Sequence, residues 1–271
     1  MQTFRVPVIR ACALASFSRA AWYRPSIAKD QSALRLRMRE LAWARPRFGF
    51  TRIWVLLRRE GWPVNLKRVR RLYRLEGLHL RQRVGWRKHR ALHRGPAPVP
   101  TGPAQRWSMD FVHVALVDGR HLRTLTVVDQ LSRQSLILEV GFRMNGATVG
   151  HALDRAIATY GKPVSITCDH GTEGMPRVLE DWALTRGVQL DYTRSGKPTD
   201  NRYIESFNGK LRDECLNVTQ FADITHAQQV IAAWRTDYNE ARPHGALGHL
   251  PPKEFAESRQ ELPTPPPQEA A

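Results

Sequence analysis

The stretch RWSMDFVHVALVDGRHLRTLTVVDQLSRQSLILEV, residues 106–140, determines the fold class of this chain. It contains three runs rich in β-branched and aromatic residues, at about 107–117, 121–129 and 134–140. An Asp-Gly pair at 118–119 marks a hairpin turn between the first two runs. The pattern predicts three consecutive antiparallel strands.

The segments that follow alternate between helical and strand-like patterns. Asn145 is placed to cap a helix that stops at Gly161, because its side chain can accept a backbone N–H. The later elements are expected as a strand at 164–169, a helix at 176–186, a strand at 188–192, and helices at 200–216 and 225–240. This order is typical of an α/β, ribonuclease-H-like fold, a mixed five-stranded sheet with flanking helices.

Positive charge is concentrated before the predicted sheet. The 271-residue chain has a formal net charge of +17. Residues 1–105 hold 24 Lys and Arg against 4 Asp and Glu, a net of +20, so residues 106–271 hold 18 against 21, a net of −3. Such a segment calls for a polyanionic partner, most commonly nucleic acid. A membrane partner is disfavoured, because the sequence lacks a run of about 18 apolar residues.

The basic segment shows three helical patterns, at 31–44, 51–61 and 65–77. The last two, joined by a short turn, have the outline of a helix-turn-helix. Basic side chains cover the surface of the third helix opposite its apolar stripe: Lys67, Arg68, Arg70, Arg71 and Arg74. We expect this surface to bind DNA. An ordinary all-α bundle with a charged exterior is the alternative.

These patterns divide the chain into four parts. We expect a helical DNA-binding region at 1–78, a basic Pro-rich linker at 79–105, the α/β core at 106–255 and a disordered tail at 256–271. The three cysteines are far apart and form no Cys-x-x-Cys pair. That spacing disfavours a zinc site or a disulfide framework and favours a reducing cytoplasm.

Three carboxylates in the core are candidates for chemistry. Asp110 lies inside the first strand among apolar residues, where an unpaired charge is costly. Asp169 ends the apolar strand at 164–169, and Glu205 lies one turn into the helix at 200–216. Hard divalent cations bind carboxylate oxygens and would offset this desolvation. Two ions about 4 Å apart suit phosphoryl transfer, one activating the nucleophile and the other stabilising the leaving oxygen.

Several motifs carry a resemblance to a known family. The spacing between Asp169 and Glu205, 205 − 169 − 1 = 35 residues, fits the Asp, Asp, 35, Glu signature of transposases and retroviral integrases. The matching segments are WSMDF at 107–111, TVVDQLSR at 126–133, CDHGTE at 168–173, SGKPTDNRYIESFNGKLRDECLN at 195–217, YNEARPHGALGHLPP at 238–252 and RPRFGFTRIWVLLRREGWPVNLKRVRRLYRLEGL at 45–78. The chain most closely resembles the second reading frame product (OrfB) of the insertion sequence three family.

The resemblance implies an integrase catalytic core in which Asp110, Asp169 and Glu205 hold two Mg²⁺ or Mn²⁺ ions and catalyse DNA strand cleavage and joining. It implies binding of the element's terminal inverted repeats and of target double-stranded DNA by a homo-multimer. It also raises the alternative of a frameshift fusion to an upstream reading frame product. One departure is Gly174, where family members usually have Phe.

Three polar residues near the carboxylates are further candidates for DNA contacts. Asn208 and Arg212 stand three and seven residues after Glu205, so a helix places them on its face. Lys197 lies in the preceding Gly-Lys-Pro segment. A structural role is an equal alternative for each of them.

Two other functions stay open beside a DNA transposase of the bacterial cytoplasm, associated with the nucleoid. One is a catalytically decayed DNA-binding remnant or repressor of transposition, which the retained three carboxylates disfavour. The other is a plain ribonuclease-H-type nuclease, which would leave the basic helical arm unexplained.

Overall fold

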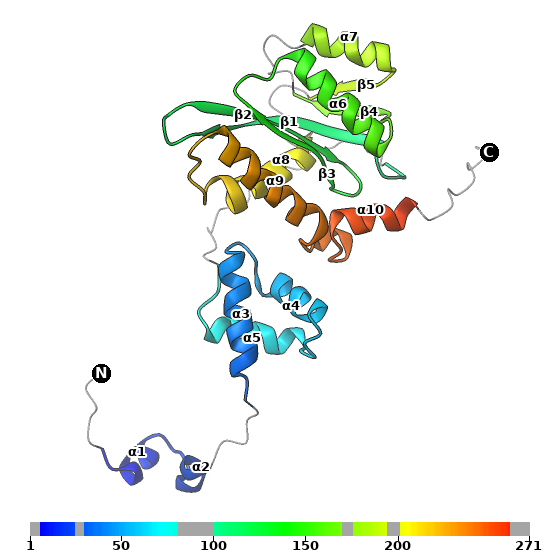
Figure 1. Cartoon of the computed structure of the whole chain (residues 1–271). Helices are drawn as coiled ribbons and strands as arrows, with labels where there is room; N and C mark the ends of the chain where they lie inside the picture. The colour runs from blue at the N-terminus through cyan, green and yellow to red at the C-terminus, as the bar shows by residue number, and fades with distance from the viewer. Residues whose placement is uncertain (1–5, 25–29, 81–99, 170–175, 194–200, 261–271) are drawn as a thin grey trace, which may run out of the picture.

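The computed structural model describes residues 6–24, 30–80, 100–169, 176–193 and 201–260 (Figure 1). Its centre is a five-stranded sheet in the order β3-β2-β1-β4-β5. The strands are β1 Arg106–Ala115, β2 His121–Asp129, β3 Ser135–Gly141, β4 Ser165–Cys168 and β5 Gln189–Tyr192. The predicted mixed sheet and its ribonuclease-H-like element order are confirmed.

The central strand β1 joins the antiparallel and parallel parts of the sheet. It pairs with β2 in antiparallel register, Trp107 opposite Asp129, and β2 pairs with β3 in the same sense. On its other edge β1 runs parallel to β4, with Ser108 beside Thr167. Strand β4 runs parallel to β5, with Cys168 beside Tyr192. Strands β1, β4 and β5 therefore point the same way.

Helices cover both faces of the sheet (Figure 1). Helices α6 (Gly146–Tyr160) and α7 (Pro176–Arg186) enclose one apolar core that includes Trp107 and Leu153. Helices α8 (Arg202–Leu211) and α9 (Ile224–Glu240) enclose a second core on the other face, which includes Phe207. Asn145 caps α6 as predicted, because its side chain accepts a 2.9 Å bond from the Thr148 N–H.

The helix predicted at 200–216 has two parts. After α8 the backbone continues as a π-helical turn, Arg212–Leu216. A π turn holds one more residue than an α turn and is commonly found at functional sites. A short 3-10 turn, Gly245–Leu247, follows α9.

The basic arm has an apolar core of its own. Helices α3 (Ser32–Ala44), α4 (Phe50–Arg59) and α5 (Leu66–Leu75) pack around a buried cluster that contains Met38, Ile53 and Val69. Asn65 caps α5 by accepting a 2.8 Å bond from the Arg68 N–H. Two short helices, α1 (Val8–Leu14) and α2 (Arg19–Tyr23), precede them. None of the helices in the described segments is both long and apolar enough to cross a membrane.

The end of the chain departs from the predicted tail. Helix α10 spans Pro252–Gln260, whereas disorder was expected from residue 256. Proline is favoured at the first position of a helix, Glu254 suits the positive end of its dipole, and Ala256 is buried. The remainder of the expected tail, 261–271, and most of the expected linker, 81–99, lie outside the described residues.

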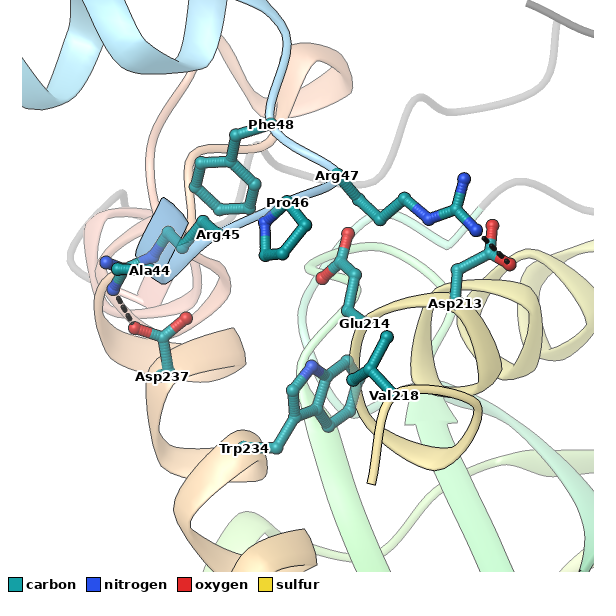
Figure 2. Close-up of a pocket in the computed structure, with 10 residues that line it drawn as sticks. All are labelled: Ala44, Arg45, Pro46, Arg47, Phe48, Asp213, Glu214, Val218, Trp234 and Asp237. Atoms are coloured by element: carbon teal, nitrogen blue, oxygen red, sulfur yellow. Dashed lines mark hydrogen bonds and ion pairs between the residues drawn. The ribbon is translucent and has the colours of Figure 1, made fainter. Parts of the chain in front are cut away.

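The arm is docked on the core through its α3–α4 loop (Figure 2). Arg45 forms an ion pair with Asp237 of α9. Arg47 forms a second one with Asp213 in the π turn, with 3.8 Å between Arg47 Nη2 and Asp213 Oδ1. Arg59 of α4 donates two hydrogen bonds to backbone carbonyls of the core, at Ala241 (2.9 Å) and His249 (2.8 Å). We call this contact region the arm–core junction.

Candidate active site

The sheet brings Asp110 and Asp169 together. Asp110 lies in β1, and Asp169 directly follows β4, its parallel neighbour. The register pairs Ser108 with Thr167. Extending that register by two residues places Asp110 beside Asp169. Their side chains thus project from neighbouring strands, as in many α/β sites at the carboxyl ends of parallel strands.

The Asp110 carboxylate is half-buried and held by two donors. The Phe111 N–H donates to Oδ1 at 2.7 Å, and Asn208 Nδ2 donates to Oδ2 at 2.8 Å. Burial raises the pKa of Asp110, the two hydrogen bonds lower it, and the nearby Asp169 charge raises it further. Asp110 is thus an oriented anion in a place that disfavours its charge.

Glu205 completes the group from the first turn of α8. Its side chain is exposed. Partial burial raises the pKa of Glu205, and the charges of Asp169 and Asp110 raise it as well. Because the charges of Asp110 and Asp169 both act on Glu205, the three predicted carboxylates lie in one negatively charged region.

Thr193 is a member of this site that the sequence analysis missed. Its Oγ1 donates a 2.5 Å hydrogen bond to Asp169 Oδ1. Thr193 follows β5 as Asp169 follows β4, and β4 and β5 are parallel neighbours. The matching positions after two predicted strands were the available signal.

The donor set fits divalent cations. Within the described segments none of the three carboxylates forms an ion pair with Lys or Arg. Oxygen donors with a surplus of negative charge are the ligands that Mg²⁺ and Mn²⁺ prefer. No group of three or more described His, Cys, Asp or Glu is arranged to hold a metal ion as it stands. Glu205 is exposed, so its side chain can change rotamer without disturbing the core.

Two of the polar candidates on α8 differ in their placement. Asn208 is 1% exposed and donates to Asp110, which favours the structural alternative for Asn208 over a direct DNA contact. Its position on the Glu205 side of the helix was predicted correctly, but its amide points at a carboxylate in the interior. Arg212 is exposed, and its charge lowers the pKa of Asp110 slightly. Lys197 lies outside the described residues.

The basic surface predicted on the third arm helix is present on α5. Lys67, Arg70, Arg71 and Arg74 are exposed, and Arg68 is half-exposed. No ion pair is found for these five side chains among the described residues. Ion pairs among the described residues therefore do not neutralise the positive charge of this surface.

Models of known protein families match both the core and the arm. Two models described as "Integrase core domain" match residues 100–198 and 186–252, and one described as "HTH-like domain" matches residues 29–86. A chain of the simian T-cell lymphotropic virus intasome, solved with the PP2A regulatory subunit B56 gamma, has a similar fold. The TM-score is 0.53 at 15% identity, covering 87% of this chain and 78% of that one. The fold and the family matches define a polynucleotidyl transferase with an integrase core.

Related proteins narrow the class. A 31.7 kDa protein of insertion element IS407 from Burkholderia multivorans is 45% identical, over 91% of this chain and 89% of its own length. The transposase InsD of element IS2 from Escherichia coli is 28% identical, over 85% of this chain and 80% of its own length. This chain belongs to the insertion sequence three family of transposases, as a second reading frame (OrfB-type) product.

Proposed function

We propose that this transposase cleaves and joins DNA strands at the ends of an insertion sequence, with Asp110, Asp169 and Glu205 as its catalytic residues. The observation that carries the proposal is the placement of the three carboxylates: the β1–β4 register sets Asp110 beside Asp169, and Glu205 lies on α8, which contacts Asp110 through Asn208. Glu205 on α8 is coupled to Asp110 in β1 and to Asp169 after β4. Such a surplus of charge at one site is stabilised by divalent cations.

The three carboxylates would hold two Mg²⁺ or Mn²⁺ ions, with Asp110 and Asp169 supplied by the rigid sheet. When bound, the ions lower the pKa of the attacking water or 3′ hydroxyl and stabilise the leaving oxygen. Asn208 and Thr193 orient one oxygen each of Asp110 and Asp169, which leaves the other lone pairs available as ligands. Arg212 is exposed, its charge acts on Asp110, and in this proposal it would bind a DNA phosphate.

The basic arm would supply end recognition. Residues 1–78 form the DNA-binding region in this proposal, 79–105 the linker and 106–255 the catalytic core. The exposed side chains on α5 would bind the terminal inverted repeats, and Lys197 would contact DNA near the carboxylates. Those on α5 are Lys67, Arg68, Arg70, Arg71 and Arg74. A homo-multimer in the bacterial cytoplasm, fused or not to an upstream reading frame product, would assemble on the two ends.

The test is a cleavage and joining assay on duplexes that carry the element ends, in Mg²⁺, Mn²⁺, Ca²⁺ or chelator. We expect activity in Mg²⁺ and Mn²⁺ and none in chelator. The variants Asp110→Asn, Asp169→Asn and Glu205→Gln should each lose several orders of magnitude, because each removes a charge that the cations need. End binding, measured separately by mobility shift, should persist in all three variants.

A matched control is Asp181→Asn, which removes an exposed carboxylate from α7. It should cleave like the parent. If Glu205→Gln cleaved as fast as this control, the metal assignment would be wrong. If the parent bound ends but never cleaved, the chain would be the DNA-binding remnant or repressor instead.

A further inference from the structure

A second polar site lies where the arm meets the core. Figure 2 shows Phe48 in the α3–α4 loop. Phe48 is buried, and the Arg242 guanidinium of the core lies 5.6 Å from the centroid of its ring. The guanidinium of Arg52, on α4, also contacts Phe48 and lies 5.2 Å from the centroid of its ring. Phe48 thus contacts Arg52 of the arm and Arg242 of the core, and the ion pairs of the arm–core junction hold the two parts together beside it.

Arg52 lines a cavity of about 360 Å³ whose other walls come from the core. That volume is more than ten times the ~30 Å³ that one water molecule occupies in the liquid. Five of the thirteen lining residues are Arg or Lys, and none is Asp or Glu: the five are Arg52, Arg133, Arg202, Lys210 and Arg242. We call this the junction pocket.

The positive charge of the junction pocket is not balanced. Glu214 is the one carboxylate in the described segments that acts on Arg52 and Lys210, and Arg242 already binds it at 2.5 and 2.9 Å. Burial lowers the pKa of Lys210 to about 8, and the neighbouring Arg242, Arg52 and Arg133 charges contribute. Cations gathered this way repel one another unless an anion joins them.

Arg133 brings one buried, unsatisfied donor to the pocket, whereas Lys210 donates to the Ser206 carbonyl and hydroxyl at 3.0 and 2.8 Å. The Arg133 Nη1 is buried without a hydrogen bond in the described structure, although burying an unsatisfied donor is costly. Its backbone has φ 63°, in the left-handed region that side chains rarely adopt. The Tyr203 ring supports the guanidinium at 3.9 Å.

We propose that the junction pocket binds a phosphate group of the DNA backbone, held by Arg52 from the arm and by Arg133 and Lys210 from the core. Guanidinium groups match phosphate oxygens with paired donors, and an ammonium group adds a point charge. A phosphate there contacts both parts of the protein. DNA binding would then stabilise the docked arm.

The pocket is separate from the carboxylate site but shares helix α8 with it. Lys210 stands five residues after Glu205, which at 100° per residue turns it about 140° around the helix axis. The α8 side that carries Glu205 and Arg212 thus differs from the side that lines the pocket. Choosing DNA as the phosphate source rests on the proposed function, whereas the capacity for phosphate does not.

The test compares the full-length parent with the double variant Arg133→Gln/Lys210→Gln. The matched control, Arg155→Gln/Arg186→Gln, removes two exposed charges from α6 and α7 on the opposite face of the sheet. Affinity for a duplex without element ends is measured in chelator at several salt concentrations. We expect the pocket variant to bind about tenfold more weakly than the control. The slope of log affinity against log salt should be smaller by about one, as expected when the protein neutralises one phosphate fewer.

A second experiment measures the thermal melt of each protein in potassium phosphate and in potassium chloride at equal ionic strength. Phosphate should raise the melting temperature of the parent and of the control but not of the pocket variant. Equal DNA affinity and equal slope in the pocket variant and the control would overturn the proposal. Protection by inorganic phosphate together with unchanged DNA binding would also overturn it, since the pocket would then be a free-anion site.

The conservative variant Lys210→Arg guards against a folding defect. It keeps the positive charge, so it should retain DNA affinity within about threefold of the parent while the Gln variant does not. If Lys210→Arg and Lys210→Gln lost affinity equally while both melted like the parent, charge at this position would be irrelevant and the assignment would be wrong. Neither experiment measures strand cleavage, so both can be interpreted even if Asp110, Asp169 and Glu205 do not catalyse it.

Discussion

Asn208 Nδ2 donates a 2.8 Å hydrogen bond to Asp110 Oδ2, and this bond ties helix α8 to the central strand of the sheet. Asn208 is nearly inaccessible. An amide that donates to one oxygen of a carboxylate fixes its orientation and leaves the other lone pairs for a metal. Asn208 is therefore a positioning residue for Asp110.

Replacing Asn208 by Ala should lower strand cleavage by about 10- to 100-fold, the usual effect of losing a partner that orients a metal ligand. The Mg²⁺ concentration needed for half-maximal activity should rise. The acidic limb of the pH profile should move to higher pH, because the hydrogen bond lowers the pKa of Asp110. Asn217→Ala, an exposed position after the π turn, is the control. An unchanged Mg²⁺ requirement together with an unmoved acidic limb would contradict the positioning role.

The carboxylate site should destabilise the metal-free chain at neutral pH. The pKa values of Asp110 and Glu205 are raised from the ordinary 3.8 and 4.5, so the folded chain binds more protons than the unfolded chain above those values. Stability then falls as pH rises from about 4 through the raised pKa values. In chelator at pH 7, Asp110→Asn should melt at a higher temperature than the parent. Added Mg²⁺ should raise the melting temperature of the parent more than that of the variant. A variant that melts below the parent in chelator would show that Asp110 is not electrostatically strained.

The basic surface on α5 should carry much of the salt dependence of DNA binding. Neutralising Arg68, Arg71 and Arg74 to Gln should weaken binding to the element ends and reduce the salt slope by about one for each phosphate that is no longer neutralised. A control with three exposed arginines of the core changed, Arg120, Arg155 and Arg186, removes the same charge elsewhere. If both triple variants bound alike across a salt titration, α5 would not be the DNA-binding surface.

Lys210 should reduce the stability of the free protein. Its pKa is lowered from 10.5 to about 8, so between those values the unfolded chain binds the extra proton and stability rises with pH. The cost of burying the ammonium group is present in full below pH 8. Lys210→Met should therefore raise the free energy of unfolding at pH 7 by roughly 2 kcal/mol and remove the rise between pH 8 and 10.

Denaturant unfolding at several pH values measures this effect. Lys253→Met, which changes an exposed lysine of α10, should leave the stability within about 0.5 kcal/mol of the parent. The titration depends on the charges that face Lys210, namely Arg242, Glu214, Arg52 and Arg133. A Lys210→Met variant less stable than the parent at pH 7 would show that the lysine is satisfied in its pocket.

The strands and their carboxylates were predictable because period-two patterns and turn residues are local signals. Asp110 sits in one predicted strand and Asp169 ends another, and parallel neighbours bring such positions together. The depth of Asn208 was not predictable. Sequence spacing gives the side of a helix on which a residue lies, but the angle at which α8 meets β1 decides whether its side chain reaches solvent or Asp110.

The arm–core junction could not be predicted for a different reason. Its contacts join residues about 190 positions apart, such as Arg45 with Asp237 and Arg59 with the His249 carbonyl. A charge run looks the same in sequence whether its members meet DNA or dock on another part of the chain. The junction pocket combines both cases, since Arg52 comes from the basic arm and its neighbours come from the near-neutral core.

The π turn Arg212–Leu216 allows the chain to change length at this point. Deleting a single residue there would let α8 continue as an ordinary helix, and the side chains after the turn would keep their directions, because a π turn absorbs one extra residue. A deletion that spares Glu214 would therefore leave its contact with Arg242 intact, and Glu205 and Asn208, upstream of the deletion, would keep their places. A one-codon in-frame loss in a copy of this gene would thus spare both the proposed catalytic residues and this ion pair of the core.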